Sequence, residues 1–417
     1  MQKNNLYPVT LNALICGVLS LGIYLFQFYF PVAYNYFVSE DSWVEYGTFV
    51  CYMMAVLLIL GAMIRDRSMR RPGYILLCLG LFFVAMEEIS WGQRLLGIRT
   101  PQMIAQYNAQ SELSLHNASF FPAEHLLFYA ILIWAVIVPE ISRRFERLGV
   151  FLKTVGIPLV SREIYPYFIL GFFLKKFNIV IRNAELGEFI TGLAFLIFSV
   201  GAYSRIGKSA EETKLAKKRL VGWAIMIVLA VTTLIVLVGP REIYALRRLL
   251  HKSAITEYPR YGMHAQAKKI FEHLVQHEEL KNNDTLFQYG LFLKKMNGNE
   301  AEGVFWEALR EARERMLKTP DKPAPNILAG KILKELNQPN LAQKEFTEAL
   351  RKDQARLAQA KLNWQRTDAL KSTGETYIEM GERELAREHL QKAYECAEDG
   401  GTKATIKGLL KTITVKY

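Results

Sequence analysis

The segment LVGWAIMIVLAVTTLIVLV, residues 220–238, is the last stretch of the chain that is long and apolar enough to cross a membrane. A helical span needs about 20 mostly apolar residues to cross roughly 30 Å of hydrocarbon. Similar segments precede it from residue 11 onward, which predicts about seven spans in all. Their expected ranges are residues 11–30, 43–64, 73–91, 123–141, 163–181, 185–203 and 220–238.

The chain changes character after this last segment. Residues 241–417 are polar and charged and contain no further apolar stretch of spanning length. Segments of about 20 apolar residues cross lipid as helices, which satisfy their own backbone polar groups. We therefore expect an all-α protein, with a seven-helix transmembrane bundle in residues 1–240 and a soluble helical domain in residues 241–417.

The charges in the loops predict the orientation. The loops at residues 65–71, 143–162 and 205–219 are short and rich in Lys and Arg, whereas the loop at residues 31–42 carries only acidic charges. Basic loops favour the cytoplasmic side. This places the N-terminus in the cytoplasm of a bacterium and the C-terminal domain in the periplasm. Basic residues at 241–248 favour the opposite orientation, in which the chain would be a membrane-anchored cytoplasmic scaffold.

The net charge of +12 would point to nucleic acid in a soluble protein. Here many of the positive charges lie in the short loops between spans, where they set the topology. We therefore expect no nucleic-acid partner. The four cysteines, three of them in expected spans, form no CxxC pair and indicate neither a disulfide framework nor a metal site.

The soluble part contains an internal repeat. Its pattern is a small residue followed by a large apolar residue one turn later and another apolar residue after that: Ala267-x3-Phe271-x2-Leu274, Ala301-x3-Phe305-x2-Ala308, Ala342-x3-Phe346-x2-Ala349 and Ala386-x3-Leu390-x2-Ala393. The small residues allow a preceding helix to approach closely. The pattern resembles the tetratricopeptide repeat (TPR), and the resemblance implies a stack of helix pairs that binds a protein or peptide partner. An unrelated helical bundle is the alternative.

Ionisable residues gather at one end of the membrane half, the end that the topology makes extracytoplasmic. Such groups are costly in a bilayer and normally line a bundle interior or a cavity. We predict an outward-facing polar site, roofed by the loop at residues 92–122, which lies outside the membrane or re-enters it. Its candidate residues are Glu45, Glu87, Glu88, Trp91, Gln93, Arg94, Asn108, Glu112, His116, Asn117, His125, Arg182, Glu185 and Glu188.

Part of this set forms a recognisable motif. The stretch Met86-Glu-Glu-Ile-Ser-Trp-Gly-Gln-Arg94, together with Asn108–Glu112 and Leu113-Ser-Leu-His-Asn117, resembles a motif set of uncharacterised bacterial multi-pass membrane proteins. The resemblance covers roughly the first 130 residues. It implies a shared site and transfers no reaction.

Three interpretations of the site remain open. In the first, Glu87, Glu88, His116 and His125 form an acid/base or metal centre of a membrane-embedded hydrolase or transferase, in which His116, His125 and Glu87 would be the ligands of a divalent ion. In the second, the site binds a lipid-linked or glycan substrate without reaction. In the third, the charges only pair structurally, Glu87 or Glu88 with Arg94 and Glu185 with Arg182.

The economical hypothesis combines the two halves. We expect an integral inner-membrane component of cell-envelope assembly, which recruits a protein partner through its repeats to a membrane site that handles a lipid-linked or glycan substrate. Whether the site catalyses a reaction stays undecided by the sequence.

Overall fold

The computed structural model describes residues 7–39, 41–93, 123–177, 181–206, 210–238 and 243–414, and every regular element within these ranges is a helix. The chain divides into two compact units, residues 1–270 and 271–417. The first unit therefore includes helices that follow the last apolar segment: α13 (Ile243–Lys252), the π-helical turn η5 (Ser253–Glu257) and α14 (Tyr258–Arg260). We describe each unit by itself.

Five helices of the described ranges are long and apolar enough to cross a membrane. They are α1 (Tyr7–Tyr29), α3 (Trp43–Arg65), the continuous rod of α7, η3 and α8 (within which Leu126–Arg144 qualifies), α11 (Asn183–Ser204) and α12 (Ala210–Val238). A helix of 23 residues, such as α1, is about 35 Å long at 1.5 Å per residue. Their length and composition indicate a membrane protein.

The other two expected spans are shorter than predicted. Helix α4 (Pro72–Glu88) has 17 residues, and α10 (Tyr165–Lys176) has 12. At 1.5 Å per residue α10 is only about 18 Å long, well short of the hydrocarbon thickness. Of the seven expected spans, five are thus long apolar helices in the described ranges, and the other two correspond to shorter helices.

Contacts along α1 show how far the segment around α10 reaches. The Asn12 side chain donates to the backbone oxygen of Glu163 at 2.6 Å, and the backbone nitrogen of Ile181 donates to the Gln27 side chain at 2.9 Å. Residues 12 and 27 of a helix are separated by roughly 22 Å. Glu163 and Ile181, which lie before and after α10, therefore contact α1 at two points far apart along its length.

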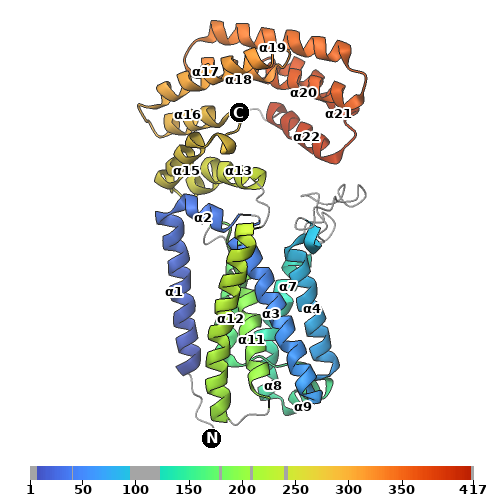
Figure 1. The fold of residues 1–417 in the computed structure, drawn as a ribbon. Coiled ribbons are helices and arrows are strands. Elements are labelled where there is room, and N and C mark those ends of the chain that lie inside the picture. The colour runs from blue at the N-terminus through green and yellow to red at the C-terminus, as the bar shows by residue number, and fades with distance from the viewer. Residues whose placement is uncertain are drawn as a thin grey trace. The chain divides into compact units, whose positions relative to one another are not determined.

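Helices α3 and α11 form the centre of the first unit. Helix α3 packs against α4, α11 and α12, and α11 packs against α10 (Figure 1). A Cβ atom added to Gly187 of α11 would lie under 3.0 Å from the backbone of α10, so this contact requires glycine. Rings fill the core beside it, where Trp134 stacks on Phe195 with centroids 5.6 Å apart. In contrast, only 6% of the apolar window of α1 is buried.

The second unit is a succession of helices, each packed against the next. Figure 1 shows them as a curved array. Their bounds are α16 (Thr285–Lys295), α17 (Ala301–Lys318), α18 (Ala324–Glu335), α19 (Pro339–Gln359), α20 (Asn363–Met380), α21 (Arg383–Cys396) and α22 (Gly400–Thr414), and α15 (His264–Gln276) contains the boundary between the units.

Three of these helix pairs share one contact. The repeat residues Phe305, Phe346 and Leu390 are buried, and each lies against a glycine of the preceding helix. A Cβ atom at Gly290, Gly330 or Gly374 would lie under 3.0 Å from the side chain of Phe305, Phe346 or Leu390, respectively. The alanines of the pattern, Ala301, Ala308, Ala342, Ala349, Ala386 and Ala393, are buried as well. The same small-to-large contact thus recurs three times along the unit.

Candidate functional site

Four carboxylates predicted as site residues come together at one end of the first unit. Glu88, at the end of α4, interacts electrostatically with Glu45 of α3 and with Glu185 and Glu188 of α11. The phenol of Tyr52, which lies about two turns after Glu45 on α3, interacts electrostatically with Glu88 and Glu188. Three helices therefore supply the acidic side chains, which we call the acidic cluster (Glu45, Glu88, Glu185 and Glu188).

A lysine compensates part of this charge. Lys175 forms an ion pair with Glu188, and the two side chains are 7% and 17% exposed. The Lys175 ammonium also lies 5.4 Å from the ring centroid of Phe128, and Lys176 lies 5.0 Å from that of Tyr129. The two lysines that interrupt the expected fifth span thus meet an acid and two aromatic rings. The sequence indicated the interruption, but not the Lys175–Glu188 pair.

A tight turn follows Glu88 and carries Trp91. Ser90, Trp91 and Gly92 have φ angles of 47°, 56° and 75°, in the left-handed region that non-glycine residues rarely adopt. The turn brings the indole of Trp91 back toward α4, where its Nε1 donates to Glu87 Oε1 at 2.6 Å. Strained residues of this kind cost about 1–3 kcal/mol each and cluster at functional sites. Glu87 is buried, whereas Trp91 is 40% exposed.

The start of α3 orients Glu45. The backbone nitrogen of Asp41 donates to Glu45 Oε2 at 2.6 Å, and the Tyr46 hydroxyl donates to Asp41 Oδ1 at 3.0 Å. Asp41 also has a positive φ, of 56°. A carboxylate in the first turn of a helix is favoured by the helix dipole. The loop residue and the two side chains of α3 therefore hold one another in place at the edge of the acidic cluster.

The predicted pair of Arg182 and Glu185 is present. Arg182 Nη1 lies 3.4 Å from Glu185 Oε1, and both side chains are partly exposed. Arg182 precedes α11 with a φ of 56°, and Asn183 closes the turn by donating to the backbone oxygens of Leu174 and of Phe177, the latter at 2.6 Å. This turn sets the position of the first residues of α11, on which Glu185 and Glu188 lie.

Several predicted residues lie outside the described part of the chain. These are Arg94, Asn108, Glu112, His116 and Asn117, while His125 lies on α7 with its side chain not described. Gln93 is described and buried. Within the described ranges, no three His, Cys, Asp or Glu side chains are arranged to hold a metal ion. The predicted pairing of Glu87 or Glu88 with Arg94, and the metal centre with His116, therefore stay predictions.

A buried polar network near this site was missed by the sequence reasoning. The Tyr34 hydroxyl donates to the backbone oxygen of Ile181, whose nitrogen is bound by Gln27. Asn35 accepts from Ser253 Oγ at 2.6 Å and lies 3.4 Å from the Tyr258 hydroxyl. Two amides, Gln27 and Asn35, in otherwise apolar and aromatic sequence were the available signal, since buried amides need partners. The network fixes Ile181, the residue before Arg182.

In comparisons with known proteins, no protein-family model matches the chain, and no curated protein matches it either.

Proposed function

We propose that the acidic cluster binds a hydroxyl-rich or cationic group of a lipid-linked or glycan substrate, and that the second unit recruits a protein partner to it. The observation that carries the proposal is the convergence of Glu45, Glu88, Glu185 and Glu188 from three helices at the end of an apolar bundle. Ionisable groups inside a membrane protein are expensive and are retained for function.

The charge balance of the cluster defines the chemistry of the ligand. Among the described residues, Lys175 pairs with Glu188 and Arg182 pairs with Glu185, two of the four carboxylates of the cluster. Carboxylates accept hydrogen bonds, so they suit hydroxyl and ammonium donors. Like charge disfavours a phosphate at the same place. The cluster therefore fits the sugar or amine portion of a lipid-linked molecule rather than its phosphate, and the half-exposed ring of Trp91 offers an apolar face beside it.

The seven-crossing topology belongs to this proposal. Glu163 and Ile181 contact α1 at positions roughly 22 Å apart, which supports a crossing between them despite the short α10. Counting it and α4 with the five long helices gives an odd number of crossings. With basic loops in the cytoplasm, the acidic cluster and the second unit then share the periplasmic side of an inner membrane. A reporter fused to the C-terminus tests this: alkaline phosphatase should be active there, and a fluorescent protein that matures only in the cytoplasm should be dark.

The repeated contact between a glycine and a large apolar side chain supports the TPR-like assignment of the second unit. Stacks of such helix pairs present extended surfaces to peptides and proteins. A partner captured on the second unit would be brought to the membrane face that holds the acidic cluster. This is the basis for the role in cell-envelope assembly.

The binding test compares lipids that co-purify with the protein. A glycan-bearing or amine-bearing lipid should be retained by the wild type and lost in Glu88→Gln, which replaces a carboxyl group of the cluster by an amide while keeping the shape of the side chain. Glu146→Gln, in the first turn of α9 (Glu146–Val155) on a basic loop, is the matched control and should retain it. An unchanged lipid profile in Glu88→Gln, with both proteins folded, would refute the binding site.

The enzyme remains the second candidate, because Tyr52 places a phenol beside Glu88 and Glu188. Carboxyl and phenol groups both serve as proton donors or acceptors in acid/base catalysis. Conversion of the retained lipid by the wild type but not by Glu88→Gln would favour the hydrolase or transferase over simple binding.

A further inference from the structure

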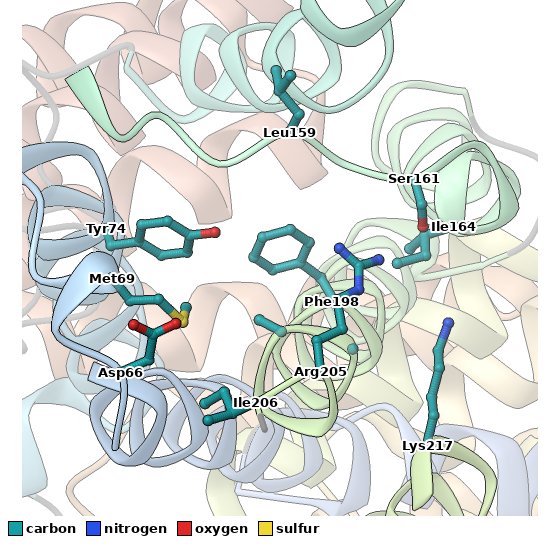
Figure 2. Close-up of a pocket in the computed structure, with 12 residues that line it drawn as sticks. Asp66, Met69, Tyr74, Leu159, Ser161, Ile164, Phe198, Arg205, Ile206 and Lys217 are labelled. Carbon is teal, nitrogen blue, oxygen red and sulfur yellow. The ribbon is translucent and has the colours of Figure 1, made fainter. Parts of the chain in front are cut away.

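A cavity of about 160 Å³ lies at the end of the first unit opposite the acidic cluster (Figure 2). Tyr74, in the first turn of α4, lines it, whereas Glu88 ends the same helix. The two residues are about 20 Å apart along the helix axis. The cavity is therefore separate from the proposed substrate site, and it lies among the basic loops.

The lining of the cavity has an apolar and a cationic part. Figure 2 shows the Arg205 guanidinium and the Lys217 ammonium on the side of Ser161, while Tyr74 lies on the other side. Apolar side chains complete the walls, namely Met69, Leu159, Ile164, Phe198 and Ile206. A cavity that combines apolar walls with cations at the ends of membrane helices suits an anionic amphiphile.

The pairing of the charged groups distinguishes Arg205 from the others. Lys217 forms an ion pair with Glu163, and Asp66, which also lines the cavity, accepts from the backbone nitrogen of Ser68 at 2.8 Å. Arg205 forms neither an ion pair nor a side-chain hydrogen bond with any residue that the structure describes. It is thus a cation that lines a cavity and has no acceptor among the described residues.

Two other arginines at this end of the first unit donate hydrogen bonds to backbone oxygens. Arg70 donates to the backbone oxygen of Met63 at 2.8 Å, and Arg71 donates to that of Lys153. These two close the ends of helices. Because a charge-assisted bond to phosphate is among the strongest that a guanidinium forms, the unpaired Arg205 is the natural phosphate contact.

We propose that this cavity binds the phosphate headgroup region of an anionic phospholipid, with Arg205 as the main contact and Tyr74 as a further hydrogen-bond donor. Basic pockets between membrane helices on the cytoplasmic side are a recurrent site for anionic headgroups. The volume admits a headgroup phosphate, and the acyl chains would remain in the bilayer. The free phosphate ion has the same chemistry and is separated from the lipid by the test.

The test measures lipid binding to the detergent-purified full-length protein by native mass spectrometry. Phosphatidylglycerol should bind at one tight site, and phosphatidylcholine should not occupy it. Arg205→Gln should weaken the binding about tenfold or more, as expected for the loss of a hydrogen bond to a charged group. Arg67→Gln is the matched control, because Arg67 is an exposed arginine of the same face that does not line the cavity. It should leave the tight site unchanged.

A second variant keeps the proposal testable if Arg205→Gln fails to fold. Ala202 lines the cavity from α11, so Ala202→Met should fill it and abolish the tight site without removing a charge. Equal weakening by Arg67→Gln and Arg205→Gln would overturn the proposal, as would equal binding of phosphatidylcholine. Complete displacement of the lipid by a millimolar excess of inorganic phosphate would overturn the lipid as the ligand. None of these results depends on the acidic cluster.

Discussion

Adding one methyl group to Gly330 tests the packing of the second unit. Gly330 lies on α18, and a Cβ atom there would come under 3.0 Å from the ring of Phe346, which is 1% exposed. The ring is enclosed by α18 and α19, so it cannot move aside freely. Overpacking of this kind costs about 1–3 kcal/mol. Replacing a mid-helix glycine by alanine gains about 1 kcal/mol of helix propensity. We expect a net loss of up to about 2 kcal/mol in Gly330→Ala.

A second glycine of the same unit provides the control. Gly303 lies on α17, and a Cβ atom there would meet nothing within 4 Å. Gly303→Ala should therefore show the propensity gain alone, and the two variants should change stability in opposite directions. Hydrogen exchange of the full-length protein, followed by mass spectrometry, reports the opening free energy of peptides from each helix.

The comparison has a clear refuting result. Protection of the α18 and α19 peptides should fall in Gly330→Ala, whereas protection of the α17 peptides should rise or stay unchanged in Gly303→Ala. If Gly330→Ala were as protected as Gly303→Ala, the close contact between glycine and ring would not be present. The repeat assignment would then lose its main structural support.

Three further predictions concern buried polar groups. Burial raises the pKa of Asp353 in α19 to about 6. The contribution of the protonated carboxyl group to the free energy of unfolding is therefore full below the unfolded pKa near 4 and is lost as pH rises through 6. Asp353→Asn should stabilise the second unit by up to about 3 kcal/mol at pH 7.5 and by little at pH 4, as measured by denaturant unfolding at both pH values. Glu188→Gln should deplete the protein from the membrane, because it breaks the ion pair of the buried Lys175 with Glu188 at a cost of about 3–5 kcal/mol. Adding Lys175→Met should restore the abundance of the protein on an immunoblot, and equal depletion in the double variant would contradict the ion pair. Tyr34→Phe removes one buried hydrogen bond and should lower stability by about 1 kcal/mol, visible as a lower melting temperature of the purified protein.

The apolar segments of the sequence predicted the helices of the membrane half, but they did not define where each helix ends. Residues 163–181 are apolar enough to be taken for a span, yet the helix ends at Lys176, and Asn183 and Gln27 bind the backbone of Phe177 and of Ile181, respectively. The hydrogen bond between Gln27 and Ile181 joins residues that are more than 150 positions apart in the sequence. No local pattern encodes it.

The candidate site was predictable in its location and less so in its pairing. Acidic residues at the ends of several expected spans share one side of the membrane once the topology is assigned, which is why Glu45, Glu88, Glu185 and Glu188 could be grouped. Their actual partners depend on side-chain positions in three dimensions, as Lys175 shows. The cavity around Arg205 had no signal in the sequence, because its basic residues look like ordinary topology determinants.

The polar contacts of α1 have a consequence for the biogenesis of the protein. Asn12 and Gln27 find their final partners in Glu163, Tyr167 and Ile181, which are synthesised some 150 residues later. At about 5–20 residues per second, the delay is on the order of ten seconds. During that time α1 has two amide side chains on an apolar helix whose acceptors and donors do not yet exist. Helix α1 therefore obtains these partners long after its own synthesis, and it needs water, a neighbouring chain or the insertion machinery to accommodate its amides until residues 163–181 arrive.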